Sequence, residues 1–507
     1  MRERVRRLLN CLEDGLIERE TPVRLALLTA IAGEHLLLIG TPGTAKSALA
    51  RKLHLAFEEG NYFERLLTRF SVPEELFGPL SIKALEKDRY QRLTDRYLPS
   101  ATIAFIDEIF KANSAILNSL LTLLNEREFD NGDQRVKVPL ISVIGASNEL
   151  PEEDELQALY DRFLCRYHVK PVTDQAFEEL LQLKEKKQCK PEEKDRLDRE
   201  TIKQIQHGAE QVLLSTEVLE LLTSIRKFLQ ENRLSVSDRR WRKVVKLLKV
   251  SAYTNDQESV TIWDCWLLQH CLWDTPEKQK LIAQWYEAHV GIGSGFNPQR
   301  LEKLVQTWEQ ACRSDVESQT QMRNEKGELV YINDHGDQTT EWKKTEWSHR
   351  EDQPLYLSPP DQDDRTNNGS GYTETELKEQ FFDDRYQQSH IDGQWQHIGK
   401  YISDAANRLI SIHENEPCME PTRHPESFIA ARIKETDNIK ADIDLLRDKL
   451  QLQIDSLGKD IGEHLWIDSD FSTTAEASLK KSLTLAESLS ERMANVISQY
   501  EKLPVQE

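Results

Sequence analysis

Residues 35–54 read HLLLIGTPGTAKSALARKLH and decide the fold of the N-terminal part of the chain. The apolar run 35–39 predicts a short buried strand, and the segment ALARKLHLAF that begins at residue 48 predicts a helix. Small residues between them let successive backbone N–H groups turn toward phosphate oxygens, at the positive end of the following helix. The sequence therefore predicts a phosphate-binding P-loop, made of Gly40, Thr41, Pro42, Gly43, Thr44, Ala45, Lys46 and Ser47.

Three residues of this loop decide its chemistry. Lys46 would place a positive charge on the β- and γ-phosphates of a nucleotide, and the Ser47 hydroxyl would bind Mg²⁺. The usual pattern has Gly before the Lys, whereas this chain has Ala45. A methyl group at this position is tolerated if φ is negative and costly if φ is positive.

Two further apolar runs end in polar residues, as the partners of a P-loop do. The run 101–106 leads into Asp107 and Glu108, the pattern of a Walker B strand in which Asp107 contacts the Mg²⁺ shell and Glu108 polarises the attacking water. The run 140–144 is followed by Asn148. If its strand lies between the other two, the Asn148 amide reaches the γ-phosphate or the water, the sensor 1 role. An Asn after a strand is also a common turn former or helix cap.

Six motifs together resemble the MoxR family of AAA+ ATPases and, within it, the RavA (regulatory ATPase variant A) branch. They are GTPGTAKS at 40, TRFSVPEELFGPLSIKAL at 68, LPSATIAFIDEIFKANSAILNSLLTLLNEREF at 98, ASNELP at 146, ALYDRFL at 158 and VSDRRW at 236. RavA-like proteins also carry Ala before the P-loop Lys. The resemblance covers residues 1 to about 285, and more weakly the last eighty or so. It implies a three-layer α/β core followed by an α-helical lid.

The resemblance also implies roles for two arginines. ALYDRFL is similar to the segment that presents an arginine finger to a neighbouring subunit, which indicates Arg162, with Arg166 as a rival. VSDRRW is similar to the sensor 2 motif. Its family spacing, Ser-x-Arg, favours Arg239 over Arg240. An arginine delivered from another chain neutralises charge on the transferred phosphoryl group and raises the rate by ~10³-fold or more.

Hydrophobic periodicity divides the chain into four predicted parts. Residues 1–175 alternate strand runs with amphipathic helices, as an α/β core does, and 176–290 are helical, as a lid is. A glycine-rich linker at 291–295 precedes a discontinuous helical arm, 291–319 and 425–507. The arm carries an inserted, partly β or irregular module at 320–424. Within the module, 354–371 are polar and proline-bearing, a composition that favours disorder.

Two segments of the core stand between its fixed motifs. Residues 70–99 correspond to the helix-2 insert, which in the MoxR family faces the central channel. Residues 129–138, with Asn131-Gly132 at their turn, predict the pre-sensor-1 hairpin. Irregular segments between catalytic motifs are where substrate contacts are usually placed.

Composition restricts the compartment and the partners. The seven cysteines are odd in number and contain no CxxC pair, so we expect reduced thiols rather than a disulfide framework or a zinc site. Neither a signal peptide nor a membrane-length apolar segment is evident, which predicts a cytoplasmic protein. The formal charge of −21 argues against a general grip on nucleic acid.

The resemblance implies a Mg-ATP-hydrolysing homo-oligomeric ring, a hexamer, with ATP/ADP and Mg²⁺ as cofactors. Such a ring acts as a chaperone-like remodeller of protein partners, commonly beside a protein with a von Willebrand factor A domain. The 320–424 module is expected to bind a further protein. In some RavA proteins a β-rich domain at this position binds a lysine decarboxylase, but 320–424 shows no convincing match to it. The alternatives are a nucleic-acid motor or restriction/defence-type translocase subunit, and a scaffold that binds nucleotide without turnover.

Overall fold

The computed structural model describes residues 1–58, 60–151, 153–182, 189–289, 298–468 and 470–506. These described residues form two compact units, one of 1–305 with 439–492 and one of 306–438 with 493–507. The glycine-rich linker predicted at 291–295 lies outside the described residues. Among the helices of the described part of the chain, none combines the length and the apolar composition that a membrane span requires.

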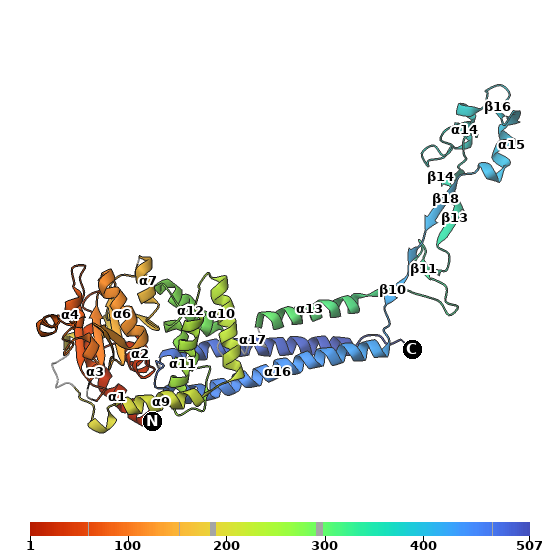
Figure 1. The fold of residues 1–507 in the computed structure, drawn as a ribbon. Coiled ribbons are helices and arrows are strands. Elements are labelled where there is room, and N and C mark those ends of the chain that lie inside the picture. Colours follow the sequence, from red (N-terminus) through yellow and green to blue (C-terminus); the bar gives the residue numbers. More distant parts are fainter. Residues whose placement is uncertain (59, 152, 183–188, 290–297, 469, 507) are drawn as a thin grey trace. The chain divides into compact units, whose positions relative to one another are not determined.

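The N-terminal α/β core contains, in its described part, a five-stranded parallel sheet of order β2-β3-β6-β1-β7. Figure 1 shows this core in red to yellow. Its inner strands are buried throughout, because helices cover the sheet on both sides. This arrangement confirms the predicted α/β class. The strands are β1 (Leu36–Ile39), β2 (Tyr62–Leu66), β3 (Ile103–Asp107), β6 (Ser142–Ser147) and β7 (Cys165–His168). The core helices are α1 (Arg2–Glu13), α2 (Glu20–Ile31), α3 (Lys46–His54), α6 (Ser114–Glu126), α7 (Asp154–Tyr160) and α8 (Asp174–Gln182).

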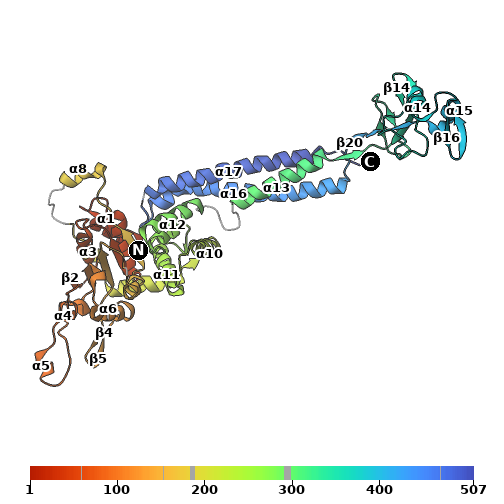
Figure 2. The ribbon, with the colours of Figure 1, turned by 90° about the horizontal axis from the view of Figure 1, so that it is seen from above.

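Two segments project from this core next to each other (Figure 2). Residues 70–99 contain the short helices α4 (Pro73–Phe77) and α5 (Ile82–Leu85), and the strands β4 (Glu128–Asn131) and β5 (Gln134–Lys137) pair as an antiparallel hairpin. Asn131 joins the two segments, because its Oδ1 accepts from the Arg92 backbone N–H at 2.6 Å and its Nδ2 donates to the Arg92 carbonyl at 3.2 Å. Large apolar side chains point to solvent here: Phe70 is 91% exposed and Ile82 is 74% exposed.

The lid that follows the core is helical, as the resemblance implies. Its helices are α9 (Arg199–Gln211), α10 (Thr216–Glu231), α11 (Asp238–Thr254) and α12 (Pro276–His289), and a parallel pair of short strands joins β8 (Leu213–Leu214) to β9 (Ser259–Val260). Two serines fix where helices begin, since the Ser215 hydroxyl accepts from Val218 N–H and the Ser237 hydroxyl accepts from Arg240 N–H.

A helical hairpin of residues 439–492 completes the first unit. It consists of parts of two long antiparallel helices, α16 (Glu426–Gly462) and α17 (Asp470–Glu501), which lie side by side (Figures 1 and 2). The turn between them contacts the lid and the core. On the lid side, the Trp466 indole N–H donates to Thr254 Oγ1 at 2.8 Å. On the core side, Arg24 Nη1 donates to the Ile467 carbonyl at 2.8 Å.

The second unit holds the interrupted ends of the helical arm. α13 (Pro298–Glu317) enters it, and a buried cluster joins its helices: Cys312, Ile429, Val496, Tyr500 and Leu503. β10 (Gln319–Gln321) then pairs with β20 (Met419–Pro421) at the base of the inserted module. The other elements of the module are β11 (Tyr331–Ile332), β12 (Gln338–Thr339), β13 (Lys343–Trp347), β14 (His349–Arg350), β15 (Gln353–Pro354), α14 (Glu374–Phe381), β16 (Gln388–Ile391), β17 (Gln394–His397), α15 (Ile398–Ser403), β18 (Ile410–Glu414) and β19 (Glu416–Pro417).

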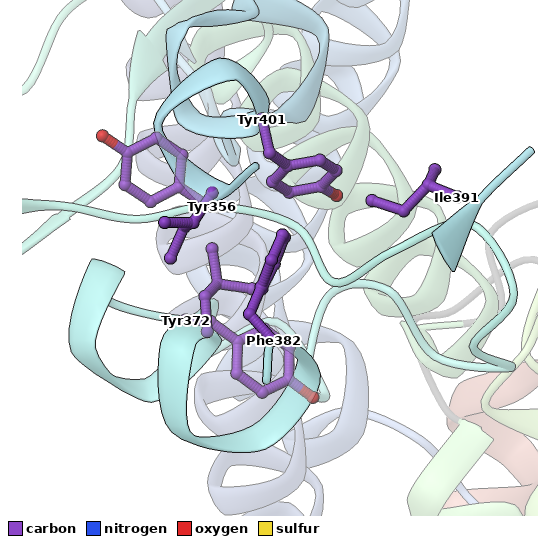
Figure 3. Close-up of a cluster of buried hydrophobic side chains, with 7 residues drawn as sticks. Tyr356, Tyr372, Phe382, Ile391 and Tyr401 are labelled. Atoms are coloured by element: carbon purple, nitrogen blue, oxygen red, sulfur yellow. The ribbon is translucent and has the colours of Figure 1, made fainter. Parts of the chain in front are cut away.

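The disorder predicted for 354–371 is wrong, because this segment forms part of a small core. Tyr356 and Tyr372 pair through their backbones and pack in one buried cluster with Leu377, Phe382, Ile391, Ile398 and Tyr401 (Figure 3). Within the segment, Arg365 Nε donates to the Ser358 carbonyl at 2.9 Å. A few aromatic residues, together with turns closed by Asp and Asn side chains, outweigh the polar composition.

The expectation of reduced thiols is also wrong at two positions. Cys11 and Cys189 form a disulfide, with Cα atoms 5.4 Å apart and a sequence separation of 178. α1 packs beside the segment that follows Cys189, where Arg7 Nη2 lies 2.7 Å from Asp195 Oδ1. Spacing along the chain carries no trace of this contact, so cysteine counting could not detect it. The other five cysteines, all within the described residues, are free thiols.

Candidate functional site

The P-loop joins the end of β1 to the start of α3, and its backbone is bent at residues with positive φ. Gly40 approaches β7 closely: a Cβ added to it would lie 2.3 Å from the Val169 carbonyl oxygen. Gly43 has φ +82°. Ala45 has φ +63° and ψ 21°, so it occupies the left-handed region that the sequence identified as the costly case. Relative to glycine, this conformation costs an alanine about 1 kcal/mol or more.

The Lys46 side chain turns back onto the loop itself. Lys46 Nζ donates to the carbonyls of Gly40 at 2.7 Å and Thr41 at 2.9 Å. Burial lowers the pKa of the Lys46 ammonium, while Asp107 and Glu108 act in the opposite direction. The ammonium therefore lies within the electrostatic reach of both Walker B carboxylates. Ser47 is half-buried, and its Oγ forms no hydrogen bond with the described residues.

The strand order brings three sets of sequence-predicted residues to one edge of the sheet. β6 lies between β3 and β1, and all three strands are parallel. Their carboxyl ends therefore place Asp107, Asn148 and the P-loop along the same edge. Asn148 is exposed. The Glu108 backbone has φ +51°, and the Glu108 N–H donates to Asp107 Oδ1 at 3.0 Å. Glu108 Oε2 lies 3.2 Å from Lys111 Nζ.

The two predicted arginines, by contrast, lie at the opposite edge of the sheet. Arg162 precedes β7, whose first residue Cys165 pairs with Leu36 at the start of β1. The P-loop follows the far end of β1, so at least ~13 Å of strand separates it from Arg162. Burial lowers the pKa of Arg162, and the positive charge of the neighbouring Arg239 lowers it further. Arg239 Nη2 donates to Asn125 Oδ1 at 2.7 Å.

Burial separates these arginines from their rivals. Arg166 is 4% exposed, its guanidinium stacks 3.7 Å from the centre of the Tyr160 ring, and burial lowers its pKa to about 9. Arg240 is 5% exposed and donates to the Phe163 and Leu164 carbonyls at 3.0 and 2.7 Å. Both have internal partners. Arg239 is exposed, and 21% of the Arg162 side chain remains accessible.

One buried residue that sequence reasoning missed supports the P-loop. Arg19 is 6% exposed, and it donates from Nε to the Thr44 carbonyl at 3.2 Å and from Nη2 to the Lys170 carbonyl at 2.9 Å. It ties the loop to the chain that leaves β7. The available signal was weak: Arg19 is a charged residue directly before a helix that is almost wholly buried.

The arrangement can hold a nucleotide with its metal. Among the described residues no group of three His, Cys, Asp or Glu side chains gathers as a metal site. A Mg²⁺ ion at Ser47 and Asp107 would therefore take its remaining ligands from phosphate oxygens and water, which is how P-loop sites hold this ion. The free Ser47 hydroxyl and the nearby Asp107 carboxylate fit that role.

Comparison with known proteins gives matches over the first part of the chain. A family model described as the MoxR domain in the MoxR-vWA-beta-propeller ternary systems matches residues 3–207, and a model of the AAA lid domain matches 217–286. An uncharacterized protein of Methanocaldococcus jannaschii is 45% identical over 284 residues, which are 56% of this chain and 72% of the relative. A second protein of that organism is 45% identical over 280 residues, 55% of this chain and 73% of the relative. A crystal structure from Cytophaga hutchinsonii aligns with a TM-score of 0.46 at 16% identity, and the alignment covers 56% of this chain and 93% of that one.

Proposed function

Because this chain belongs to the MoxR family of AAA+ ATPases, we propose that it binds ATP with Mg²⁺ and hydrolyses it to ADP and phosphate in a homo-oligomeric ring. The observation that carries the proposal is the division of the site between two edges of one sheet. The P-loop, Asp107 and Asn148 share the carboxyl edge, and Arg162 with Arg239 lies at the other. One chain therefore offers a phosphate cradle without the arginines that phosphoryl transfer requires.

Each residue of the cradle has a proposed task. Lys46 holds the β- and γ-phosphates, and it leaves the Gly40 and Thr41 carbonyls to do so. Ser47 and Asp107 hold Mg²⁺, which neutralises phosphate charge when bound. Glu108 orients and polarises the attacking water once its carboxylate leaves Lys111, and Asn148 fixes the position of that water.

The arginines act on a neighbour's nucleotide in this proposal. Arg162 is the finger and Arg239 is the sensor 2 arginine, because Arg166 and Arg240 are buried with internal partners. Contact between the arginine edge of one chain and the P-loop edge of the next is head-to-tail, and such contacts form a ring when the rotation between neighbours closes. We propose a hexamer, as the family resemblance implies.

The biological setting is proposed from the family and the sequence. The matching MoxR model is named for systems that contain a vWA protein, and this supports a von Willebrand factor A domain protein as partner of a chaperone-like remodeller. Ala45 and a helical arm interrupted by a module support the RavA branch, with 320–424 as a site for a further protein. The five free thiols support a cytoplasmic location. The Cys11–Cys189 disulfide is the one feature that does not support it, because disulfides are rare in that compartment.

Three single substitutions test the chemistry. Lys46→Ala should abolish nucleotide binding, whereas Glu108→Gln should keep ATP bound and stop turnover. Arg162→Ala should retain nucleotide binding and lower kcat by ~10³-fold. Binding of a fluorescent ATP analogue and release of phosphate are the two measurements.

The control is Lys203→Ala, which removes an exposed lysine of α9 and should change neither measurement. If Glu108→Gln hydrolysed ATP at the wild-type rate, Glu108 would not be the catalytic carboxylate. Unchanged nucleotide affinity in Lys46→Ala would show that the P-loop is not the binding site.

A further inference from the structure

A strip of cations runs along one face of α11. Arg239, Arg242, Lys243 and Lys246 follow one another at spacings of three, one and three residues, which places them on one side of a helix. They line a surface hollow of about 490 Å³, and Asp238 is the one carboxylate in its lining. We call these four residues the α11 basic strip. It contrasts with the formal charge of −21 on the whole chain.

Contacts within the chain neutralise only part of the strip. Lys243 Nζ lies 2.6 Å from Glu34 Oε2, and Arg239 donates to a neutral amide, that of Asn125. Arg242 and Lys246 are exposed, and neither forms an ion pair with the described residues. Burial, Lys243 and Arg127 together lower the pKa of Lys246, although Glu34 raises it. Carboxylates of the same chain, Glu34 and Asp238 among them, therefore neutralise the four cations only in part.

An opposite charge lies on the α/β core, in the segment that follows β6. After Asn148 the chain carries Glu149, Glu153 and Glu155, all exposed, and no Lys or Arg occurs between Ser147 and Arg162. Glu155 belongs to the first turn of α7, beside Ser114, whose hydroxyl donates to it at 3.4 Å. These three carboxylates follow closely in sequence on Asn148, the residue predicted to reach the γ-phosphate. We call them the acidic rim of the site.

We propose that the α11 basic strip docks on the acidic rim of a second copy of this chain. The inference rests on the proposed ring and specifies which surfaces hold neighbouring subunits together. Arg239 belongs to the strip and Asn148 adjoins the rim, so the contact that pairs the charges also brings Arg162 and Arg239 toward the neighbour's phosphates. Opposite charge across an interface selects the partner and fixes its register, and it speeds association. The site of one chain is incomplete without this contact.

The test is a charge swap in the full-length chain. Arg242→Glu with Lys246→Glu should prevent ATP-dependent assembly in sedimentation experiments and lower turnover at least about tenfold, and Glu153→Lys with Glu155→Lys should do the same. The chain that carries all four substitutions has complementary edges again, so it should recover assembly and most of the turnover. Raising the salt concentration should weaken assembly of the wild type.

Matched variants make the result specific. Arg226→Glu with Lys227→Glu reverses the same number of charges on exposed positions of α10, and it should assemble and hydrolyse ATP as the wild type does. Arg162→Ala should assemble and fail in turnover. Suppose that the wild type assembles and hydrolyses ATP and that the double variants of the strip and of the rim both do so equally well. The proposed docking surfaces are then wrong, while the proposed function stands.

Two other outcomes would also overturn the inference. Failure of the four-fold variant to recover would show that strip and rim do not face each other. Weaker binding of an ATP analogue to monomeric Arg242→Glu/Lys246→Glu would show that the strip holds phosphate in its own chain. A wild type that neither assembles nor turns over ATP would instead refute the proposed function.

Discussion

At the scale of single residues, burial decides which of several similar side chains is available for chemistry. Arg166 and Arg240 each lie within a few residues of a candidate arginine, yet their guanidinium groups bind carbonyls inside the protein. Arg162 and Arg239 keep accessible surface. Arg19 shows the reverse case, because a residue without a motif is fixed against the P-loop carbonyl of Thr44. The type of residue and its spacing thus define candidates, and packing chooses among them.

Ala45 gives a prediction at this scale. Its left-handed backbone strains an alanine but not a glycine, so Ala45→Gly should raise the free energy of unfolding by about 0.5–1 kcal/mol. The unfolded chain offsets part of the gain because Gly is more flexible there. Denaturant unfolding of both proteins measures the difference. Ala48→Gly, at an exposed helical position three residues on, should be destabilising by about 1 kcal/mol. Equal effects at the two positions would contradict the backbone argument.

At the scale of elements, the turn of the helical hairpin is bound to both parts of the nucleotide domain. His464 Nε2 lies 3.2 Å from the buried Asp264 carboxylate of the lid, and the Leu465 N–H donates to Asn255 Oδ1 at 3.0 Å. On the core side, Thr21 donates to Asp468 at 3.0 Å and Arg6 donates to the Glu463 carbonyl at 3.0 Å. Core and lid, which also contact each other directly, are therefore both bound to a turn that lies more than 170 residues further along the chain.

Trp466 is a large, almost fully buried side chain of this turn, and it is 2% exposed. Trp466→Ala should lower the free energy of unfolding by about 3–5 kcal/mol, because it leaves a cavity and removes the bond to Thr254. Trp466→Phe should cost less, since most of the volume stays. The midpoint of the first denaturation transition is the measurement. Leu452→Ala, at a site that is 70% exposed on the same hairpin, should change the free energy of unfolding by less than about 0.5 kcal/mol. If Trp466→Ala left the free energy of unfolding unchanged, the turn would not stabilise the core and the lid.

At the scale of the whole molecule, the nucleotide machinery and the inserted module belong to different compact units. The module has its own aromatic core around Tyr356 and Tyr401, and Asp and Glu outnumber Lys and Arg about two to one in residues 319–421. An acidic unit with its own core adds little to a P-loop domain in the other unit. Recruiting a partner protein is the use we propose for it.

Deletion of the module tests this division. The Thr422 N–H donates to the Ser318 carbonyl at 3.0 Å, so a short Gly/Ser linker can join these residues after removal of 319–421. Basal ATPase activity and assembly should stay within about twofold of the wild type, because no residue of the proposed site is lost. Phosphate release and sedimentation are the measurements. Collapse of either would mean that the module is part of the assembly. Unchanged binding of every partner protein would remove the recruiting role.

The sequence by itself determined the α/β class, and it predicts the residues of the candidate site. Runs of apolar residues ending in GTPGTAKS, Asp107-Glu108 and Asn148 specify strands and their polar ends, because burial and phosphate binding depend on local order along the chain. Only the tertiary structure revealed the features that depend on contacts between segments far apart in sequence. This includes the disulfide of Cys11 with Cys189, the burial of Arg240 beside an exposed Arg239, and the order of the segment 354–371 around Tyr356. Such contacts arise from packing between elements far apart in sequence, and neither spacing nor composition encodes that packing.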